Sequence, residues 1–410
     1  MFSEHILKLA QACEKDCKEQ FEYIDRIAFI NTQKVMKVFA DNRLSDRHFV
    51  PTSGYGYNDD GRDLCDKMFA DAFGAEAGFA RHSIINGTQA LSIGLYALLR
   101  PGDTLLSVVG KPYDTLDGVI GISGKTGDGS LADFGVNYKQ IDLDEKGYPD
   151  IQRIKNALAE DKSIKVVFVQ RSKGYSARRT LTVKDIDLIC DTVRECSDAY
   201  VMVDNCYGAF TEEKEPNADL LVGSLIKNAG GGIAESGGYL VGTARAVELA
   251  SYRYSTVGVG LECGASLGQT KSIIKGLFYA PHTVAQAVKT AVFAARMFEK
   301  LGFTVSPKYD EKRSDIIQTF TLGSEDALVK FCQGIQAGSP VDAHVAPVPW
   351  EMPGYNDRVI MAAGAFTQGS SIELSCDGPI REPYIAYLQG GLTYESGKYG
   401  ILKAAQTVTE

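Results

Sequence analysis

A single lysine, Lys227, lies among glycines in the stretch GSLIKNAGGGIAESGGYLVG, which spans residues 223–242. Glycine allows tight turns and close approach of the backbone to a ligand. A lysine held out of water at such a turn has a lowered pKa, and its neutral amine is a competent nucleophile toward an aldehyde. The stretch therefore predicts a nucleophilic lysine held at one position. The simpler alternative is a surface lysine on a flexible glycine-rich loop.

Two other segments could supply groups that bind the same ligand. Asp204 ends the apolar run VMVD, so it should lie at the carboxyl end of a buried strand, where a carboxylate can bind a cationic N–H group. Gly87 and Thr88 follow Asn86 at a predicted helix start, where free backbone N–H groups bind anions such as phosphate. Ser224, in the glycine-rich stretch, is a further candidate to bind that anion. Each segment also has an ordinary interpretation, as a turn aspartate or as a helix N-cap.

These groups together indicate one cofactor. The helix start suits a phosphate, the carboxylate suits a protonated ring nitrogen, and the lysine suits an aldehyde. Pyridoxal 5'-phosphate carries all three. The combination is more specific than any of its parts.

The elements expected to position these residues alternate between strands and helices from about residue 80 to 280. Apolar strands are predicted over 104–110, 164–170 and 200–205, with helices beginning after Asn86 and Thr182. Such alternation predicts an α/β fold with a mostly parallel central sheet, whose ligands bind beyond the carboxyl ends of the strands. We divide the chain into an N-terminal helical arm (1–50), a large cofactor-binding domain (51–280) and a smaller C-terminal α+β domain (281–410). In the last, a long helix is expected after Pro281, followed by strands over 316–322, 359–366 and 371–376.

The composition limits the kind of partner. The 410 residues carry a net charge of −9 without a basic stretch, which argues against nucleic acid or an anionic membrane as a partner. Nine scattered cysteines without a CxxC pair, together with five histidines, predict reduced thiols and no metal site. No signal peptide and no apolar run long enough to span a membrane is recognised. We expect a soluble cytoplasmic protein with a small-molecule ligand.

The chain resembles the fold-type-I pyridoxal-phosphate enzymes, over nearly its full length. Within them it is most similar to the methionine γ-lyase / cystathionine β-lyase-like group, often labelled aluminium resistance proteins. The resemblance rests on the segments GYGYNDDGRD (54–63), NGTQAL (86–91), GKPYDTLDGVIG (110–121), VQRSKGYSARRTL (169–181), VDNCYGAF (203–210), SLIKNAGGGIAESGGYLVG (224–242) and IELSCDGPIREPY (372–384).

The resemblance implies a role for each candidate around the cofactor. Lys227 would bind the cofactor aldehyde and later move the proton of the substrate Cα, while Asp204 would pair with the ring nitrogen. The phosphate would be bound by Gly87, Thr88 and Ser224. Tyr113 would stack on the ring and protonate a leaving group, unless it is a core tyrosine. Gln170 and Arg171 would lie near the phenolic oxygen of the ring, with Arg171 in reach of the substrate.

Other implied roles concern the substrate and a second subunit. Arg381 would bind the substrate α-carboxylate, although a structural ion pair is the alternative, and Arg178 is a further candidate anion binder. Tyr55 and Tyr57 would reach the phosphate site of a neighbouring subunit, which makes the active site part of a homodimer or homotetramer interface. Packing beneath the N-terminal arm is the alternative for both tyrosines.

Two positions depart from the family pattern. The residue before Lys227 is Ile226, where related lyases carry a hydroxyl residue in an S-x-T-K pattern, so one phosphate contact is lost or replaced. Asp114 follows Tyr113 where methionine-degrading members carry a cysteine, which argues against methionine as the substrate.

The function implied is a carbon–sulfur lyase that converts an amino acid of the methionine, cystathionine or cysteine type to a 2-oxo acid and ammonia. β-Elimination and γ-elimination both stay open. The alternatives are an aminotransferase or another amino-acid lyase, and a non-catalytic cofactor-binding stress-response protein.

Overall fold

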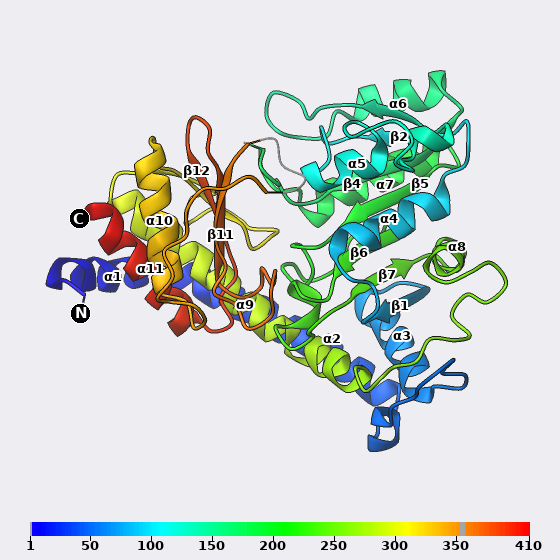
Figure 1. Cartoon of the computed structure of the whole chain (residues 1–410), viewed down its shortest axis with the longest axis horizontal. Helices are drawn as coiled ribbons and strands as arrows, with labels where there is room; N and C mark the ends of the chain where they lie inside the picture. Colours follow the sequence, from blue (N-terminus) through cyan, green and yellow to red (C-terminus); the bar gives the residue numbers. More distant parts are fainter. Residues whose placement is uncertain (1, 177, 353–356) are drawn as a thin grey trace.

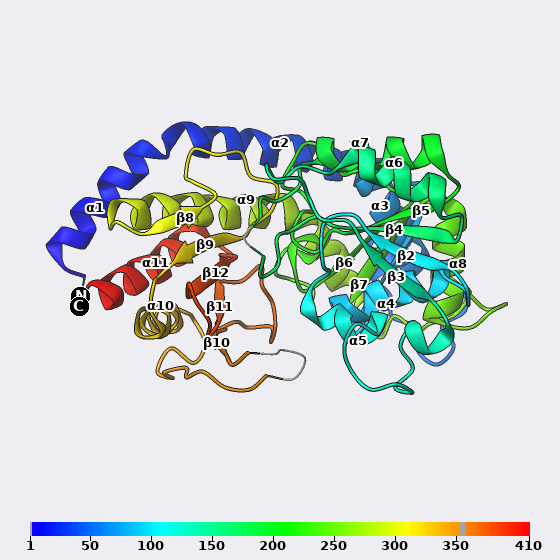
Figure 2. The ribbon, with the colours of Figure 1, turned by 90° about the horizontal axis from the view of Figure 1, so that it is seen from above.

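The N-terminal part of the chain is helical. The computed structural model describes residues 2–176, 178–352 and 357–410. Helices α1 (Glu4–Asp16) and α2 (Lys18–Asp41) run beside the long helix α9 (Thr270–Lys300), as Figures 1 and 2 show. The predicted helical arm is therefore present, although it is divided at Cys17. The long helix begins earlier than predicted, and Pro281 lies inside it instead of preceding it.

A seven-stranded sheet forms the larger part of the molecule (Figure 1). The four strand pairs at its centre and one edge are parallel, and the two pairs that join β6, β7 and β1 are antiparallel. This arrangement confirms the predicted α/β fold with a mostly parallel sheet. Across the sheet the strands are β1 (Ala77–Arg81), β7 (Gly238–Gly242), β6 (Leu220–Ser224), β5 (Tyr200–Asp204), β4 (Ile164–Gln170), β2 (Thr104–Ser107) and β3 (Asn137–Gln140).

Helices cover both faces of this sheet, which explains why its central strands are apolar throughout. In β5, Val201 and Val203 pack into the core beneath α3, α6, α7 and α9, whereas Met202 packs into the core beneath α4 and α8. Burying each such side chain contributes about 1.5–3 kcal/mol. The remaining helices of this part are α3 (Asp60–Phe73), α4 (Gly87–Leu98), α5 (Asp117–Ile120), α6 (Ile151–Glu160), α7 (Val183–Cys196) and α8 (Ala244–Tyr254), with 3₁₀ turns η1 (Asp46–Phe49), η2 (Asp114–Leu116), η3 (Ala132–Phe134) and η4 (Asn228–Gly230).

A second, five-stranded antiparallel sheet follows α9 in the sequence. Helix α10 (Glu325–Ala337) packs on it, and α11 (Tyr394–Thr409) packs against α10 and α9. The core between them contains the clustered rings of Phe298, Phe320 and Phe331. Its strands, in spatial order, are β10 (Val359–Ala362), β11 (Ser375–Pro379), β12 (Ile385–Gln389), β9 (Gln318–Thr321) and β8 (Thr304–Ser306). The strand predicted over 371–376 is therefore displaced along the chain.

The two ends of the chain lie together beside this second sheet (Figures 1 and 2), where Ser3 N donates a hydrogen bond to Gln406 Oε1. Within the described residues, no helix combines the length and the apolar composition needed to cross a lipid bilayer.

Candidate active site

A cleft of about 410 Å³ opens beyond the carboxyl ends of the parallel strands and is closed on its other side by the second sheet. The strand register brings three of the predicted residues to one edge: Gln170 ends β4 opposite Asp204 at the end of β5, and Ser224 ends the neighbouring β6. The predicted residues that line the cleft are Gly87, Thr88, Tyr113, Gln170, Asp204, Ser224 and Lys227.

Lys227 follows β6 and points its ammonium group into this cleft. Its Nζ donates to Tyr207 Oη at 2.6 Å and to Ser371 Oγ at 3.1 Å, and it lies 3.9 Å from the centre of the Tyr207 ring. The neighbouring Asn228 fixes the segment by donating from Nδ2 to the carbonyl oxygens of Tyr207 and Ala209. The lysine is therefore held at one position and is not on a flexible surface loop.

The expectation of a lowered pKa for Lys227 is wrong for this arrangement. Burial by itself lowers the pKa of the amine, but the electrostatic attraction of Tyr207, Cys206 and Asp204 outweighs burial and raises it above its ordinary value. These surroundings therefore favour the charged form of the side chain.

The glycines after Lys227 serve mainly to bring this turn against its neighbours. A Cβ on Gly230 would overlap the carbonyl of Leu225, and one on Gly231, which has φ +57°, would overlap the carbonyl of Gly276 in α9. Backbone packing, rather than space beside a cofactor, therefore explains these two glycines.

Asp204 provides a carboxylate at the floor of the cleft. Its Oδ1 accepts a hydrogen bond from the backbone N–H of Cys206 at 3.0 Å. Burial raises the pKa of Asp204, while the Cys206 N–H, Lys227 and Arg178 act in the opposite direction. A cationic N–H donor beside this carboxylate would lower its pKa and favour the charged form.

The amino end of α4 lies against the ends of β5 and β6. A Cβ on Gly87 would lie 3.2 Å from Cys206 Sγ and 3.5 Å from the Cβ of Ser224, so a larger residue there would press against the cysteine. Thr88 Oγ1 lies 2.9 Å from the hydroxyl of Thr115, and Asn86 caps the helix by accepting from Gln89 N. Hydroxyl groups and free backbone N–H groups thus converge as an anion site requires.

Tyrosine rings form one wall of the cleft. The Tyr113 backbone N–H donates to Gln170 Oε1 at 2.6 Å, and the Tyr113 ring lies edge-on to Tyr175 with centroids 5.6 Å apart. Tyr387 continues the wall, because its ring lies 4.8 Å from Tyr175 and its hydroxyl donates to the Tyr175 carbonyl. Only Tyr113 of these rings was predicted.

Asp377 is a second carboxylate in the cleft that was not predicted. Burial raises its pKa to about 7, although Tyr175, Lys227 and Gln389 act to lower it. Its Oδ1 is buried and has no hydrogen-bond partner among the described residues. The residue lies in IELSCDGPIREPY, where its position in the sequence gave no sign that β11 would carry it to Lys227.

Arg171 is placed differently from the prediction. Its guanidinium is 1% exposed and pairs with Glu212 at 3.0 Å and Glu215 at 3.3 Å, and it also donates to Asn205 Oδ1. It does not line the cleft, because these partners hold it within the framework that supports residues 205–215. Arg178 has a positioning role, since its Nη2 donates to the Gln170 carbonyl at 2.7 Å.

Arg381 lines a recess of about 270 Å³ that adjoins the cleft and shares Tyr113 and Gln170 with it. Its Nη1 donates to Asp357 at 2.9 Å, so the predicted alternative of an ion pair is present. In the same recess Asp114 pairs with Lys111 at 3.1 Å, whereas Ile226 lines the cleft itself.

Tyr55 and Tyr57 lie outside the cleft of their own chain. Their side chains are 75% and 59% exposed, and their ring centroids are 5.7 Å apart. The alternative of packing beneath the N-terminal arm does not account for rings this exposed.

Comparisons with known proteins bear on the family and the fold of this chain. The sequence model of the methionine gamma-lyase family matches residues 6–409. The chain is 48% identical to the uncharacterized protein YnbB of Bacillus subtilis (strain 168) over 411 residues, which cover 99% of this chain and 97% of that protein. The crystal structure of a carbon–sulfur lyase involved in aluminum resistance from Clostridium novyi NT is 51% identical and superposes with a TM-score of 0.95, covering 98% of this chain and 96% of that one.

A more distant structure shares the fold. The pyridoxal-5'-phosphate dependent protein YhfS from Escherichia coli is 16% identical, with a TM-score of 0.61 and coverage of 93% of this chain and 96% of that one. The family match over almost the whole chain confirms the resemblance that the sequence segments predicted. The chain belongs to the methionine gamma-lyase family.

Proposed function

We propose that this protein is a pyridoxal-phosphate-dependent carbon–sulfur lyase, which eliminates a sulfur leaving group from an amino acid of the methionine, cystathionine or cysteine type. The observation that carries the proposal is the meeting of Lys227, Asp204 and the amino end of α4 in one cleft. The carbon–sulfur lyase from Clostridium novyi NT supports the reaction class, because it is 51% identical over nearly the whole chain.

The residues of the cleft fit the cofactor. Lys227 is a partly buried lysine that can supply an amine. Asp204 is a carboxylate with a raised pKa that can pair with a ring N–H. The start of α4 at Gly87 can serve as an anion site. The wall formed by Tyr113 suits a flat aromatic ring.

When bound, the cofactor supplies an aldehyde that captures amines and a ring that withdraws electrons from the substrate α-carbon. Thr88 and Ser224 bind the phosphate together with the backbone N–H groups of α4, and Asp204 holds the ring nitrogen protonated. Lys227 Nζ, positioned by Tyr207 and Ser371, moves the proton at the substrate α-carbon.

The elimination breaks the Cα–H bond and the C–S bond of the substrate. Tyr113 Oη donates a proton to the departing sulfur, and one water converts the remaining unsaturated amino acid to a 2-oxo acid and ammonium. Arg381 binds the α-carboxylate from the adjoining recess once its ion pair with Asp357 opens.

The test uses the full-length protein loaded with pyridoxal phosphate and incubated separately with cystathionine, cystine and methionine. We expect ammonium, a 2-oxo acid and a sulfur product in equal amounts from at least one of them, the sulfur product being a thiol from cystathionine or methionine and a persulfide from cystine. A 2-oxo acid with the pyridoxamine form of the cofactor and no thiol would instead show an aminotransferase. Bound cofactor whose absorption responds to no amino acid would show a non-catalytic protein.

A variant at Asp204 tests the role of the carboxylate. Asp204→Ala should reduce turnover by about 10²-fold or more, because the ring nitrogen loses its charged partner. The matched control is Asp191→Ala, since Asp191 is exposed and its ion pair with Arg194 is a long surface contact of 3.9 Å. Full turnover in Asp204→Ala with cofactor bound contradicts the assignment.

We further propose that the working form is a homodimer or homotetramer in which Tyr55 and Tyr57 complete the phosphate site of a neighbouring chain. Their exposure supports this proposal, because two large rings side by side on the surface suit an interface. Mixing inactive Lys227→Ala with inactive Tyr57→Ala should restore part of the activity if sites are shared between chains. No recovery in mixed oligomers would contradict a shared site.

A further inference from the structure

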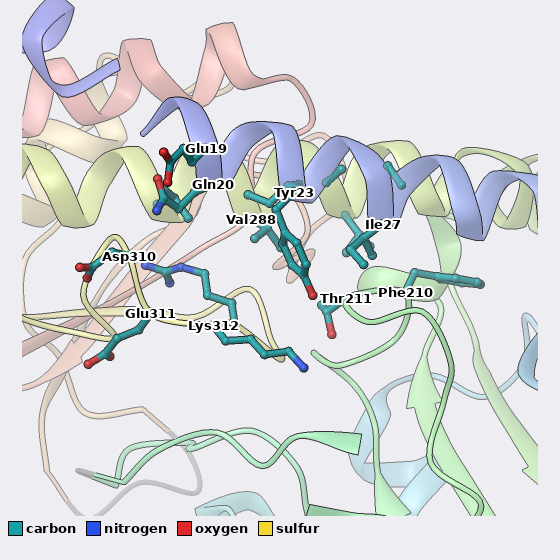
Figure 3. A pocket seen from close by; sticks show the side chains of 16 residues that line it. Glu19, Gln20, Tyr23, Ile27, Phe210, Thr211, Val288, Asp310, Glu311 and Lys312 are labelled. Atoms are coloured by element: carbon teal, nitrogen blue, oxygen red, sulfur yellow. The ribbon is translucent and has the colours of Figure 1, made fainter. Parts of the chain in front are cut away.

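A second cavity, of about 380 Å³, lies between α2, α9 and the segment 310–313 (Figure 3). Within the described residues it shares no lining residue with the Lys227 cleft. Its volume is that of a site for a small molecule.

The polar residue that requires explanation here is Arg313. Its side chain is 7% exposed, and only Nη2 has a close partner, Gln318 Oε1 at 2.6 Å. Nε and Nη1 are buried without a hydrogen-bond partner in the described chain. The carboxylates of Asp315 and Glu311 attract this charge, but neither accepts a hydrogen bond from Nε or Nη1 in the described chain. A buried cation with unmet donors costs several kcal/mol, so an anion beside it is expected.

The rest of the cavity is divided into a polar end and an apolar end. Figure 3 shows Glu19, Gln20 and Asp310 toward one end, and Ile27 and Phe210 toward the other. Gln20 Oε1 is also buried without a partner among the described residues. The polar end thus offers unmet donors, an unmet acceptor and carboxylates, which suit a group that carries both charges.

We propose that this cavity binds an α-amino acid with an apolar side chain. Its carboxylate pairs with Nε and Nη1 of Arg313, and its ammonium donates to Gln20 Oε1 near the carboxylates of Glu19 and Asp310. Its side chain packs toward Ile27 and Val288. Arg313 Nε and Nη1 and Gln20 Oε1 are buried, so binding requires these side chains to turn toward the cavity.

Other ligand classes fit less well. A purely apolar molecule leaves the donors of Arg313 unmet, and a second negative charge meets Glu19, Asp310 and Glu311. This site does not depend on the proposed elimination reaction, because its residues lie outside the cleft.

The test is calorimetric titration of the full-length, cofactor-loaded protein with L-leucine, which carries no sulfur leaving group. We expect L-leucine to bind about tenfold or more tightly than 4-methylpentanoate or 3-methylbutylamine, which lack the ammonium and the carboxylate respectively. The binding should persist in Lys227→Ala, and the cofactor absorption reports separately on the cleft.

Two variants assign the site. Arg313→Met removes the cation, and Val288→Phe fills the middle of the cavity, between its two ends, while keeping Arg313. Each should weaken L-leucine binding about tenfold or more, whereas the matched surface variant Arg194→Met should leave it unchanged. If Arg313→Met fails to fold, Val288→Phe decides. Absent binding, or binding unchanged in Val288→Phe and in folded Arg313→Met, overturns the site, and equal binding of 4-methylpentanoate overturns its assignment to amino acids.

Discussion

Lys227 and Arg313 both lie beside cavities, but their surroundings differ. Lys227 Nζ donates to two hydroxyl groups and lies near the carboxyl groups of Asp204 and Asp377, so its partners lie within the cleft. Arg313 has two buried donors without partners in the described chain. A third cation, Arg171, is paired with two glutamates and lines neither cavity. The role of a buried cation therefore depends on its partners and not on burial itself. Lys227 is the reactive group, Arg313 is a candidate ligand-binding group, and Arg171 is part of a structural ion pair.

Removing Lys227, the reactive cation, should have the largest effect on activity. Lys227→Ala should reduce lyase turnover by about 10³-fold or more, because it removes the group that moves the substrate α-proton. The measurement is steady-state release of ammonium and 2-oxo acid. Lys67→Ala is the control, since Lys67 is an exposed partner of Asp71 on α3. Equal loss in both variants would mean that the effect is not specific to the cleft.

Removing the structural cation should affect stability most. Arg171→Met leaves Glu215 buried without its cationic partner and leaves Glu212 paired with Lys312 alone, so the free energy of unfolding should fall by about 3–5 kcal/mol. Urea unfolding measures the change. A change below about 1 kcal/mol would contradict the view that this network supports residues 205–215.

The second carboxylate of the cleft should make stability depend on pH. The pKa of Asp377 is raised to about 7 in the folded chain, so this carboxyl group loses its proton at a higher pH when folded than when unfolded. The folded state therefore binds the extra proton between about pH 4 and 7, and stability falls as pH rises through that window by up to about 1.4 kcal/mol per pH unit.

Asp377→Asn should remove this contribution. The difference in unfolding free energy between the variant and the wild type should grow from pH 5 to pH 7 and stay constant above it. Asp357→Asn is the control, because Asp357 lies near the surface in an ion pair with Arg381. Parallel pH profiles for wild type and Asp377→Asn would show that the carboxyl group titrates normally.

The smallest effect is expected for Arg313 without a ligand. Arg313→Met removes a poorly paired buried cation, which favours folding, but it also leaves Gln318 Oε1 without its donor. These effects oppose each other, so the free energy of unfolding should change by about 1 kcal/mol or less. A loss as large as that in Arg171→Met would show that Arg313 has a structural partner.

The two cavities meet through one segment of the chain. Cys206 and Tyr207 line the cleft, and Phe210 and Thr211 line the second cavity. The guanidinium of Arg171 stabilises this segment by donating hydrogen bonds to Asn205 and Thr211. Variants in either cavity should therefore be checked for effects in the other.

Local patterns in the sequence were enough to predict the framework and the central groups of the site. The apolar run over 164–170 became β4, and Thr182 caps α7 as expected. Lys227, Asp204 and Gly87 lie at the ends of strands or the start of a helix, where the carboxyl edge of a parallel sheet must bring them together. Local signals were enough because the apolar pattern of a buried strand and the capping residue of a helix both lie within a few positions along the chain.

Only the tertiary structure decided which residues face these groups from distant segments. Asp377, Ser371 and Tyr387 reach the cleft because the second sheet packs against the first. Each of the three residues lies more than 140 positions after Lys227 in the sequence. The same applies to Arg171, whose glutamate partners lie more than 40 residues further along the chain. Whether a charged side chain binds a ligand, reacts or supports the fold depends on long-range partners and on the local dielectric, and spacing along the chain specifies neither of them.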